Sequence, residues 1–204
     1  MSCMTKILLA TNNPGKVKEV QAVFNAHGSA NKLISLADLG LFFEPTETGT
    51  TFEENAVQKA TKTMEFLRKN GYENMPVLAD DSGLCINALN NDPGVDSANF
   101  MGRETPYEVR NAHLISLLAD KPNRTAKFVC VIAYAHPNGN VTTTEAAIHG
   151  EIAHEPSGQG GFGYDPIFYV PEYGKTSAEL TMEEKNKISH RGKALGLMIG
   201  KLAL

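Results

Sequence analysis

Two adjacent carboxylates follow an apolar run near the middle of the chain. Residues 76–79 are typical of a buried strand, and Asp80, Asp81, Ser82 and Gly83 come directly after them. Neighbouring side chains of a strand point to opposite faces, so only one of the two carboxylates can readily face a given site. Magnesium binds one or two protein carboxylates together with water and substrate phosphates. The pair indicates a magnesium site, and the alternative is a polar turn in which Asp caps the chain and Gly relieves strain.

A second polar segment joins a short apolar strand, residues 6–10, to the helix that follows it. Its sequence is TNNPGK, residues 11–16. Exposed backbone amides at a helix N-terminus, together with one lysine, can hold a phosphate group. The Walker A pattern GxxxxGKS/T is absent, and a plain strand-to-helix turn with a solvated lysine is the alternative interpretation. The segment by itself is compatible with both.

A glycine-rich segment lies in the last quarter of the chain. Residues 158–163 hold four glycines in six positions, and Phe162 lies among them. Glycines let the backbone approach a ligand closely, and an aromatic ring can stack on a base. The segment neither opens a helix nor lies in a βαβ unit, so it does not fit a dinucleotide-binding fingerprint. Residues 184–191 then gather hydrogen-bond donors near a break between helices, although such charge runs are usually solvated faces.

Glu54 has a local explanation and a functional one. It ends the pattern Thr51-x-x-Glu54, which is a capping box, and acidic residues are favoured in the first turn of a helix. The functional alternative makes it a second carboxylate near the metal. The six histidines show no HExxH or comparable spacing, so His149 and His154 are expected to be ordinary strand-end residues.

Helices that recur along the chain would position these segments. A first helix, after residue 14, would bury an apolar stripe made of Val17, Val20, Val23 and Phe24. A second would run from near Thr51 to residues 70–71, with a stripe made of Phe52, Ala56, Ala60, Met64 and Leu67. A third would begin at the capping box of residues 105–108, with proline in the first helical position. Two short helices are expected at residues 182–188 and 191–202.

The strands are expected at residues 6–10, at 76–79 with a continuation at 84–86, at 126–135 and at 141–152. Residues 126–135 are almost continuously apolar, which is typical of a strand buried on both faces. Residues 137–140 form a turn that would pair this strand with the next one as a hairpin. Alternating strands and helices followed by a long hairpin predict a mixed, twisted α/β sheet flanked by helices.

The composition restricts the class of protein. The 204 residues suit one domain, residues 1–204, and a formal net charge of -4 argues against a broad surface for nucleic acid. Cys3, Cys85 and Cys130 form no CxxC pair and are expected to be reduced thiols in a cytoplasmic protein. No segment approaches the about 20 apolar residues of a membrane span, and the apolar run at the N-terminus is too short for a signal peptide.

Taken together and in this order, the polar segments resemble the Ham1 family, which includes inosine triphosphatases and bacterial purine nucleoside triphosphate pyrophosphatases. The similar pieces are TNNPGK at 11–16, FEENA at 52–56, LADDSGL at 78–84, GQGGFGYDPIF at 158–168 and ELTMEEKNKISHRGKAL at 179–195. They span nearly the whole chain, and the joint occurrence of GGFGYDPIF and SHRG is highly specific. The resemblance favours the functional interpretation of each segment over the local one.

The resemblance implies an enzyme that hydrolyses ITP, dITP or XTP to the monophosphate and pyrophosphate, by magnesium-assisted attack of water at the α-phosphorus. Such an activity would cleanse the nucleotide pool. The family's fold is an elongated mixed α/β structure with two lobes around a substrate cleft, generally a homodimer. Asp81 would accept the proton, Glu54 and Asp81 would support Mg²⁺, and Asp80 is a further candidate for the metal.

By the same resemblance, the residues expected to contact the nucleotide are Thr11, Asn12, Asn13, Pro14, Gly15, Lys16, Ser82, Phe162, Gly163, Tyr164, Asp165, Lys185, His190 and Arg191. The loop at 11–16 would hold the triphosphate, and Phe162 would stack on the base. Lys185, His190 and Arg191 would read or orient the base. Asn12 stands where family members commonly have Gly, and Asn tolerates positive φ better than most residues.

Two other functions remain open at this point. Enzymes of the Maf type resemble this fold and cleave nucleotides of other base classes, but GGFGYDPIF and SHRG argue against them. A nucleotide-binding regulatory module without turnover is the second alternative. The retained pair Asp80 and Asp81 argues against it.

Overall fold

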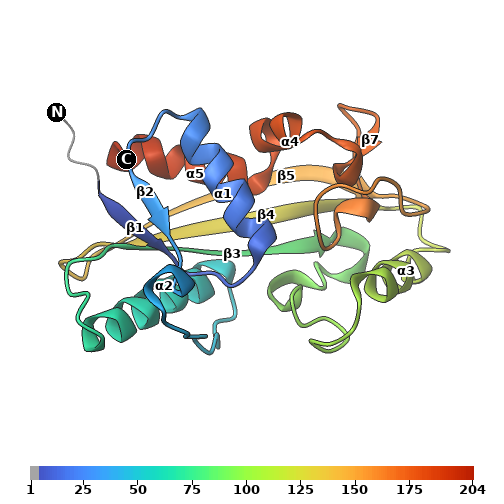
Figure 1. Cartoon of the computed structure of the whole chain (residues 1–204). Helices are drawn as coiled ribbons and strands as arrows, with labels where there is room; N and C mark the ends of the chain where they lie inside the picture. Colours follow the sequence, from blue (N-terminus) through green and yellow to red (C-terminus); the bar gives the residue numbers. More distant parts are fainter. Residues whose placement is uncertain (1–4) are drawn as a thin grey trace. The chain divides into compact units, whose positions relative to one another are not determined.

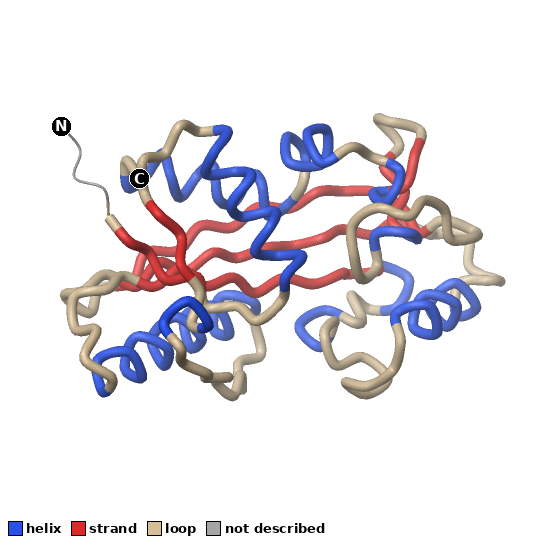
Figure 2. Tube along the Cα trace, viewed as in Figure 1, coloured by secondary structure: helices blue, strands red, loops and turns tan. Residues whose placement is uncertain are grey.

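The computed structural model describes residues 5–204, and Cys3 therefore lies outside the described residues. Strands and helices alternate along the chain before a long hairpin, as the sequence predicts. Figure 2 distinguishes the helices from the strands by colour. The strands are β1 (Lys6–Leu9), β2 (Lys32–Ile34), β3 (Val77–Ile86), β4 (Thr125–Ala135), β5 (Val141–Ile152), β6 (Phe168–Val170) and β7 (Lys175–Thr176). The α-helices are α1 (Pro14–Ala26), α2 (Phe52–Lys69), α3 (Tyr107–Leu117), α4 (Met182–Ile188) and α5 (His190–Leu202).

The strands form one sheet in the order β2-β1-β3-β4-β5-β6-β7. Strand β1 is parallel to both β2 and β3, whereas β6 is antiparallel to β5 and to β7. The mixed α/β sheet predicted from the sequence is thus confirmed. The short strands β2, β6 and β7 were not predicted, because two or three residues carry no recognisable period.

The chain divides into two compact units. Unit 1 comprises the chain up to Asp81, Cys130–Ala146 and Arg191–Leu204, and unit 2 comprises Ser82–Val129 and Ala147–His190. Three strands, β3, β4 and β5, contribute residues to both units. The single domain expected for residues 1–204 stays a prediction.

Unit 1 has two apolar clusters that contain alternate residues of its strands. Helices α1 and α5 lie on one face of the sheet and α2 on the other (Figure 1). The first cluster includes Val20 and Phe24 of α1, and the second includes Ala60 and Leu67 of α2. These are stripe positions predicted for the two helices, so the helical period alone identified the buried faces.

The core of unit 2 collects apolar residues of β3, β4, α3 and α4, among them Leu84, Leu114 and Phe128. Helix α3 begins one residue later than predicted, because Pro106 is its N-cap and makes no side-chain cap. The hydroxyl of Thr105 donates instead to the carbonyl of Met101 at 2.7 Å. The predicted capping box at residues 105–108 is therefore wrong.

Strand β3 corrects a second expectation. Asp80, Asp81, Ser82 and Gly83 were expected to follow a strand that resumes at Leu84, but β3 runs unbroken from Val77 to Ile86 through all four. The polar-turn alternative for the carboxylate pair is thus wrong. In the described part of the chain no helix is long and apolar enough to cross a membrane. Cys85 and Cys130 are free thiols, as predicted.

Candidate active site

The two adjacent carboxylates of β3 point to opposite faces of the sheet in unit 1. Leu78 belongs to the apolar cluster of α1 and α5, whereas Val77 and Ala79 belong to the cluster of α2. Asp80, two residues after Leu78, therefore points to the face of α1 and α5. Asp81, two residues after Ala79, points to the face of α2. Their side chains accordingly meet different partners, as the strand period predicts.

Asp80 is held by two cations and is 1% exposed. Its Oδ2 lies 3.0 Å from Lys16 Nζ and 3.1 Å from both Nε and Nη2 of Arg191. Arg191 Nη1 in turn donates to the buried carboxylate of Glu19 on α1. Burial disfavours the ionised form of Asp80, but Lys16, Arg191 and Lys59 outweigh it and hold the pKa of Asp80 well below its usual range.

Arg191 is therefore fixed by carboxylates at both ends of its fork. Burial opposes its charge, but Asp80 and Glu19 raise its pKa above the ordinary value, so it stays a cation. This placement makes Arg191 a support for Asp80. The base-reading role expected from the resemblance stays a prediction.

The negative charge of Asp81 has fewer and more distant cationic neighbours than that of Asp80. It is 8% exposed, its Oδ1 is 4.0 Å from Lys59 Nζ, and its buried Oδ2 has no hydrogen-bond partner among residues 5–204. Burial raises the pKa of Asp81 to about 6, although Lys59 and Lys16 oppose the shift. A buried oxygen with an unused lone pair fits a cation or the proton of a water molecule.

Lys59 of α2 lies between the carboxylates of Asp81 and Glu47 and also contacts the backbone of Asp80. Its Nζ donates to the backbone carbonyl of Asp80 at 2.9 Å and lies 3.0 Å from Glu47 Oε1. Burial opposes its charge, but Asp80, Glu47 and Asp81 together raise the pKa of Lys59. Sequence reasoning missed Lys59, Glu47 and Glu19.

A signal for two of the missed residues was present in the helical period. Glu19 follows Lys16 by three positions on the buried face of α1, and Lys59 lies between Ala56 and Ala60 on the buried stripe of α2. A charged side chain on the apolar face of a helix needs a buried partner of opposite charge. Glu47 lies in an irregular segment, where no period exists to single it out.

Glu54 forms the capping box that its sequence pattern predicts. Its Oε2 accepts from the amides of Thr50 at 2.7 Å and Thr51 at 3.2 Å, and from the Thr50 hydroxyl at 3.0 Å. These bonds lower the pKa of Glu54. The local explanation is confirmed, and the metal-binding role stays a prediction.

The metal expected from the sequence has partial support in the donor set. No group of three or more His, Cys, Asp or Glu side chains that could hold a metal ion occurs in residues 5–204. The buried Oδ1 of Asp80 and Oδ2 of Asp81 are both without hydrogen-bond partners there. Magnesium completes its shell with water and substrate phosphates, so one such oxygen on one face of the strand fits it.

The loop at 11–16 differs from the expected phosphate cradle. Asn13 is the N-cap of α1, and its Oδ1 accepts from the amides of Gly15 at 2.8 Å and Lys16 at 3.3 Å. The amide of Asn13 donates to the hydroxyl of Thr11 at 3.1 Å, and Pro14 has no amide hydrogen. The amides of Gly15 and Lys16 are therefore not exposed as expected, because the Asn13 side chain satisfies them. The phosphate-binding role of the loop stays a prediction.

Asn12 keeps an ordinary backbone conformation. It is not one of the non-glycine residues with positive φ in the described chain. The substitution of Asn for the glycine common in the family therefore causes no strain at this position.

The turn at residues 161–165, which we call the aromatic turn, is fixed within unit 2 by Asp165. The Oδ2 of Asp165 accepts from the amide of Phe162 at 2.7 Å and from Lys185 Nζ at 2.6 Å. A Cβ atom on Gly161 would overlap this carboxylate oxygen, and Gly161 has φ of +71°. Lys185 Nζ also lies 5.2 Å from the centroid of the Phe162 ring. Phe162, Asp165 and Lys185 are thus brought together, as the resemblance implies.

The remaining predicted residues of unit 2 lie in less direct positions. Tyr164 is 4% exposed and donates from its hydroxyl to the carbonyl of Ser97 at 2.7 Å. The His190 ring stacks on Phe128, with centroids 4.8 Å apart and planes 13° apart. Ser82 is half-buried in β3, directly after Asp81. Burial raises the pKa of Tyr164 to about 12, so this side chain remains a hydrogen-bond donor.

Comparison with known proteins assigns this arrangement to a family. A protein called dITP/XTP pyrophosphatase from Desulforamulus reducens is 50% identical over 192 residues, which cover 93% of this chain and 92% of that protein. The protein of the same name from Bacillus subtilis is 45% identical, with 96% of each chain covered. The structure of the Staphylococcus aureus Ham1 protein superposes with a TM-score of 0.83 at 39% identity, covering 98% of both chains. The Ham1 family sequence profile matches residues 7–201, and this chain is therefore a member of the Ham1 family.

Proposed function

We propose that this protein hydrolyses the purine nucleoside triphosphates ITP, dITP and XTP to the monophosphate and pyrophosphate, and so cleanses the nucleotide pool. The observation that carries the proposal is the buried carboxylate of Asp81, with one unpartnered oxygen and a lysine nearby. Relatives that share about half of its residues are called dITP/XTP pyrophosphatases. Their name supports the choice of substrate.

The proposed reaction is the displacement of pyrophosphate by water. The water oxygen forms a bond to the α-phosphorus, the bond from that phosphorus to the bridging oxygen breaks, and Asp81 accepts the water proton. A carboxylate whose pKa is raised toward neutrality by burial is suited to this transfer. Lys16 and Lys59 would stabilise the negative charge on the leaving pyrophosphate, with the loop at residues 11–15 beside them.

The proposed cofactor is Mg²⁺, which when bound would neutralise part of the triphosphate charge. Asp81 is the first candidate ligand. Asp80 also has an unpartnered oxygen but points to the opposite face of β3, so it is an alternative ligand and not a second one for the same ion. Glu47 forms an ion pair with Lys59, the lysine that also lies near Asp81. The negative charge of Glu47 contributes to the raised pKa of Asp81. Glu54 is proposed only from the resemblance, because its carboxylate caps α2.

Arg191 is proposed to keep Asp80 ionised and oriented. A buried carboxylate without a partner would otherwise protonate or leave its position. Lys16 would be shared between Asp80 and the phosphates.

Recognition of the base is proposed to come from unit 2. Hypoxanthine and xanthine have a carbonyl acceptor at position 6, where adenine has an amino donor. Lys185, which donates to Asp165, can only donate hydrogen bonds, so it suits the carbonyl at position 6 and not the amino group. Phe162 would stack on the base, while Ser82, Gly163, Tyr164 and His190 would shape its surroundings.

The protein is further proposed to act in the cytoplasm as a homodimer, with small-molecule nucleotides and not nucleic acid as its partners. The family resemblance supports the dimer, and the net charge of -4 supports a local phosphate site.

A nucleotide panel tests the proposed function. ITP, dITP, XTP, ATP and GTP would each be incubated with Mg²⁺, with separate assays for pyrophosphate and orthophosphate. We expect pyrophosphate and the monophosphate from the first three, orthophosphate at background, and no turnover after addition of EDTA. Release of orthophosphate and the diphosphate would contradict the proposal, and binding without any product would favour a regulatory module.

A further inference from the structure

Arg110 of α3 is a buried cation outside the site described above. It is 2% exposed, and its guanidinium makes five hydrogen bonds, all to backbone carbonyls. Nε donates to Thr105 O at 2.9 Å, Nη1 to Ser97 O at 3.4 Å and Ala98 O at 2.8 Å, and Nη2 to Gly102 O at 2.9 Å and Arg103 O at 3.0 Å. Burying a charge costs free energy. The buried guanidinium of Arg110 therefore indicates that it holds a backbone conformation that an apolar side chain could not hold.

The segment that Arg110 binds, residues 97–105, has no strand or helix to hold it. Met101 and Gly102, at its centre, have φ of 61° and 95°. A left-handed conformation at a non-glycine residue persists only where the surroundings impose it. Five carbonyls turned toward one planar fork impose it here. Two of them have a second donor, because Gly102 O also accepts from the Thr105 amide at 3.1 Å and Ser97 O from the Tyr164 hydroxyl at 2.7 Å.

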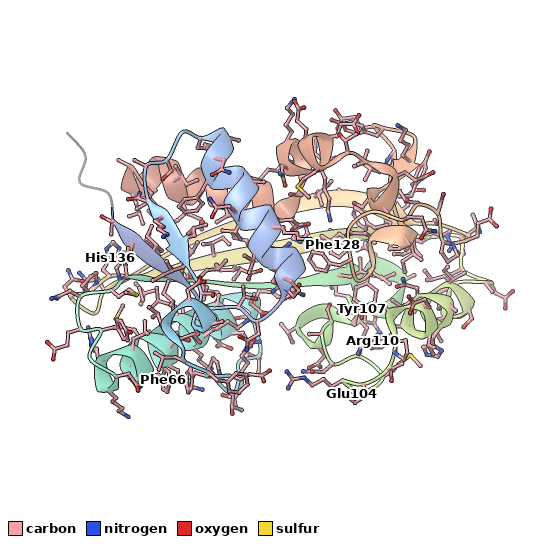
Figure 3. All side chains as sticks on the ribbon, viewed as in Figure 1. Phe66, Glu104, Tyr107, Arg110, Phe128 and His136 are labelled. Carbon is pink, nitrogen blue, oxygen red and sulfur yellow. The ribbon has the colours of Figure 1, made fainter. Side chains whose placement is uncertain are left out.

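The same segment is joined to the aromatic turn through a shared acceptor. Ser97 O receives the Tyr164 hydroxyl at 2.7 Å as well as Arg110 Nη1. Tyr107 makes a second connection, because Arg110 Cζ lies 4.7 Å from its ring centroid and the Tyr164 ring meets it edge-on at 5.2 Å. Figure 3 shows Tyr107 and Arg110 together within unit 2.

Helix α3 also contacts the backbone of the turn directly. Asn111 Nδ2 donates to the carbonyl of Gly163 at 3.2 Å. Gly163 has φ of +68°, and a Cβ atom there would be 3.5 Å from Cε1 of Tyr107. The neighbours of Arg110 on its own helix thus pack under the residue that follows Phe162.

We propose that Arg110 is a positioning residue for the base site: it fixes residues 97–105 and, through Ser97 O and the rings of Tyr107 and Tyr164, sets the turn that carries Phe162. The proposal rests on the proposed function for the identity of its substrate. Its consequence is that loss of the arginine fork weakens binding of the base while leaving the chemistry at the phosphates unchanged.

A spectroscopic variant can report the turn directly. The chain has no tryptophan, so Phe162→Trp introduces a single fluorophore into the aromatic turn. Arg110→Lys keeps the charge but lacks the planar fork that reaches several carbonyls at once. In the Phe162→Trp background we expect Arg110→Lys to shift the emission to longer wavelength and to increase quenching by acrylamide. Unchanged emission and quenching in a folded Arg110→Lys protein would overturn the proposal.

Kinetics give the second readout, in proteins that retain Phe162. We expect Arg110→Lys to raise KM for ITP about fourfold and to weaken inhibition by IMP in proportion, with kcat and inhibition by pyrophosphate within about twofold of the unmodified protein. Equal losses of IMP and pyrophosphate binding would indicate general damage and contradict a role specific to the base.

Arg124 supplies a matched control. It also donates to backbone carbonyls in unit 2, to Ile152 O and Ala153 O at 2.7 Å and to Leu118 O at 3.0 Å. Arg124→Lys should lower the melting temperature but leave KM and the emission at position 162 unchanged. If Arg124→Lys changed KM and the emission at position 162 as much as Arg110→Lys does, the proposal would be overturned.

Tyr164→Phe keeps the proposal testable if Arg110→Lys does not fold. It removes the hydroxyl that meets Arg110 at Ser97 O, and we expect a smaller shift in the same direction in emission and in KM. No change in either would contradict the connection. If the unmodified protein hydrolyses no ITP, the proposed function fails, and the emission experiment alone decides the role of Arg110.

Discussion

The two units each bury one arginine to the same degree, 2% exposed, but give it opposite surroundings. Arg191 in unit 1 is bound by the carboxylates of Asp80 and Glu19, so a charge is held by other charges. Arg110 in unit 2 is bound by five backbone carbonyls, so a charge holds a chain conformation. The difference fits the two proposed tasks: unit 1 would fix ionised groups for the chemistry, and unit 2 would fix the shape of a surface for recognition of the base.

Asp81→Asn tests the chemical task and should have the largest effect. It keeps the shape of the side chain but removes the base and its charge, so kcat for ITP should fall about 100-fold or more. Affinity for IMP should change little, because the aromatic turn is untouched. Steady-state kinetics and IMP inhibition check both, and a kcat within a fewfold of the unmodified value would remove Asp81 from the reaction.

Arg191→Ala distinguishes the support of Asp80 from base reading. Because the fork binds Asp80 and Glu19, we expect kcat/KM to fall by about 10- to 100-fold for ITP and for ATP alike. The ratio of kcat/KM for ITP to that for ATP is the measurement. A ratio that shrinks markedly, with ATP hardly affected, would restore the base-reading role that the sequence suggested.

Glu47→Gln and Glu54→Gln form a pair that sharpens the metal assignment. Glu47 shares Lys59 with Asp81, so its loss should raise the Mg²⁺ concentration for half-maximal rate about tenfold, with recovery at high Mg²⁺. Glu54 caps α2, so its loss should lower the melting temperature and leave the magnesium dependence unchanged. If instead Glu54→Gln changed the magnesium dependence and Glu47→Gln did not, Glu54 and not Glu47 would be the second carboxylate that supports the metal.

Phe162→Ala should have the smallest effect of these variants, and the effect should appear in KM. Stacking on a purine ring is insensitive to its substituents, so KM for ITP and ATP should both rise about fivefold. The kcat should be retained. A loss confined to ITP would show that the aromatic turn selects the base and does not only bind it.

The elements and charges that local rules determine could be predicted from the sequence. The capping box of Thr51 and Glu54 involves residues three positions apart, and the opposite orientation of Asp80 and Asp81 follows from the strand period. Helix α4 has the predicted bounds, residues 182–188. Contacts of this kind depend on neighbours in the sequence and need no knowledge of the fold.

The rest depends on partners that are distant along the chain. The side-chain cap of Asn13 on α1 was missed, because the glycine and lysine after it suggested a phosphate loop, and that role of the loop stays a prediction. Lys59 and Glu19 needed the whole sheet before their partners could be named. Arg110 donates its hydrogen bonds to backbone carbonyls, which every sequence has, so the sequence could not have named these partners.

The course of the reaction is the most direct test of the account. Hydrolysis of ITP in water labelled with heavy oxygen, followed by mass spectrometry of the products, shows which phosphorus the water attacks. Attack at the α-phosphorus, assisted by Asp81, predicts the label in IMP and none in pyrophosphate. Label in pyrophosphate would place the attack at the β-phosphorus and contradict the proposed mechanism.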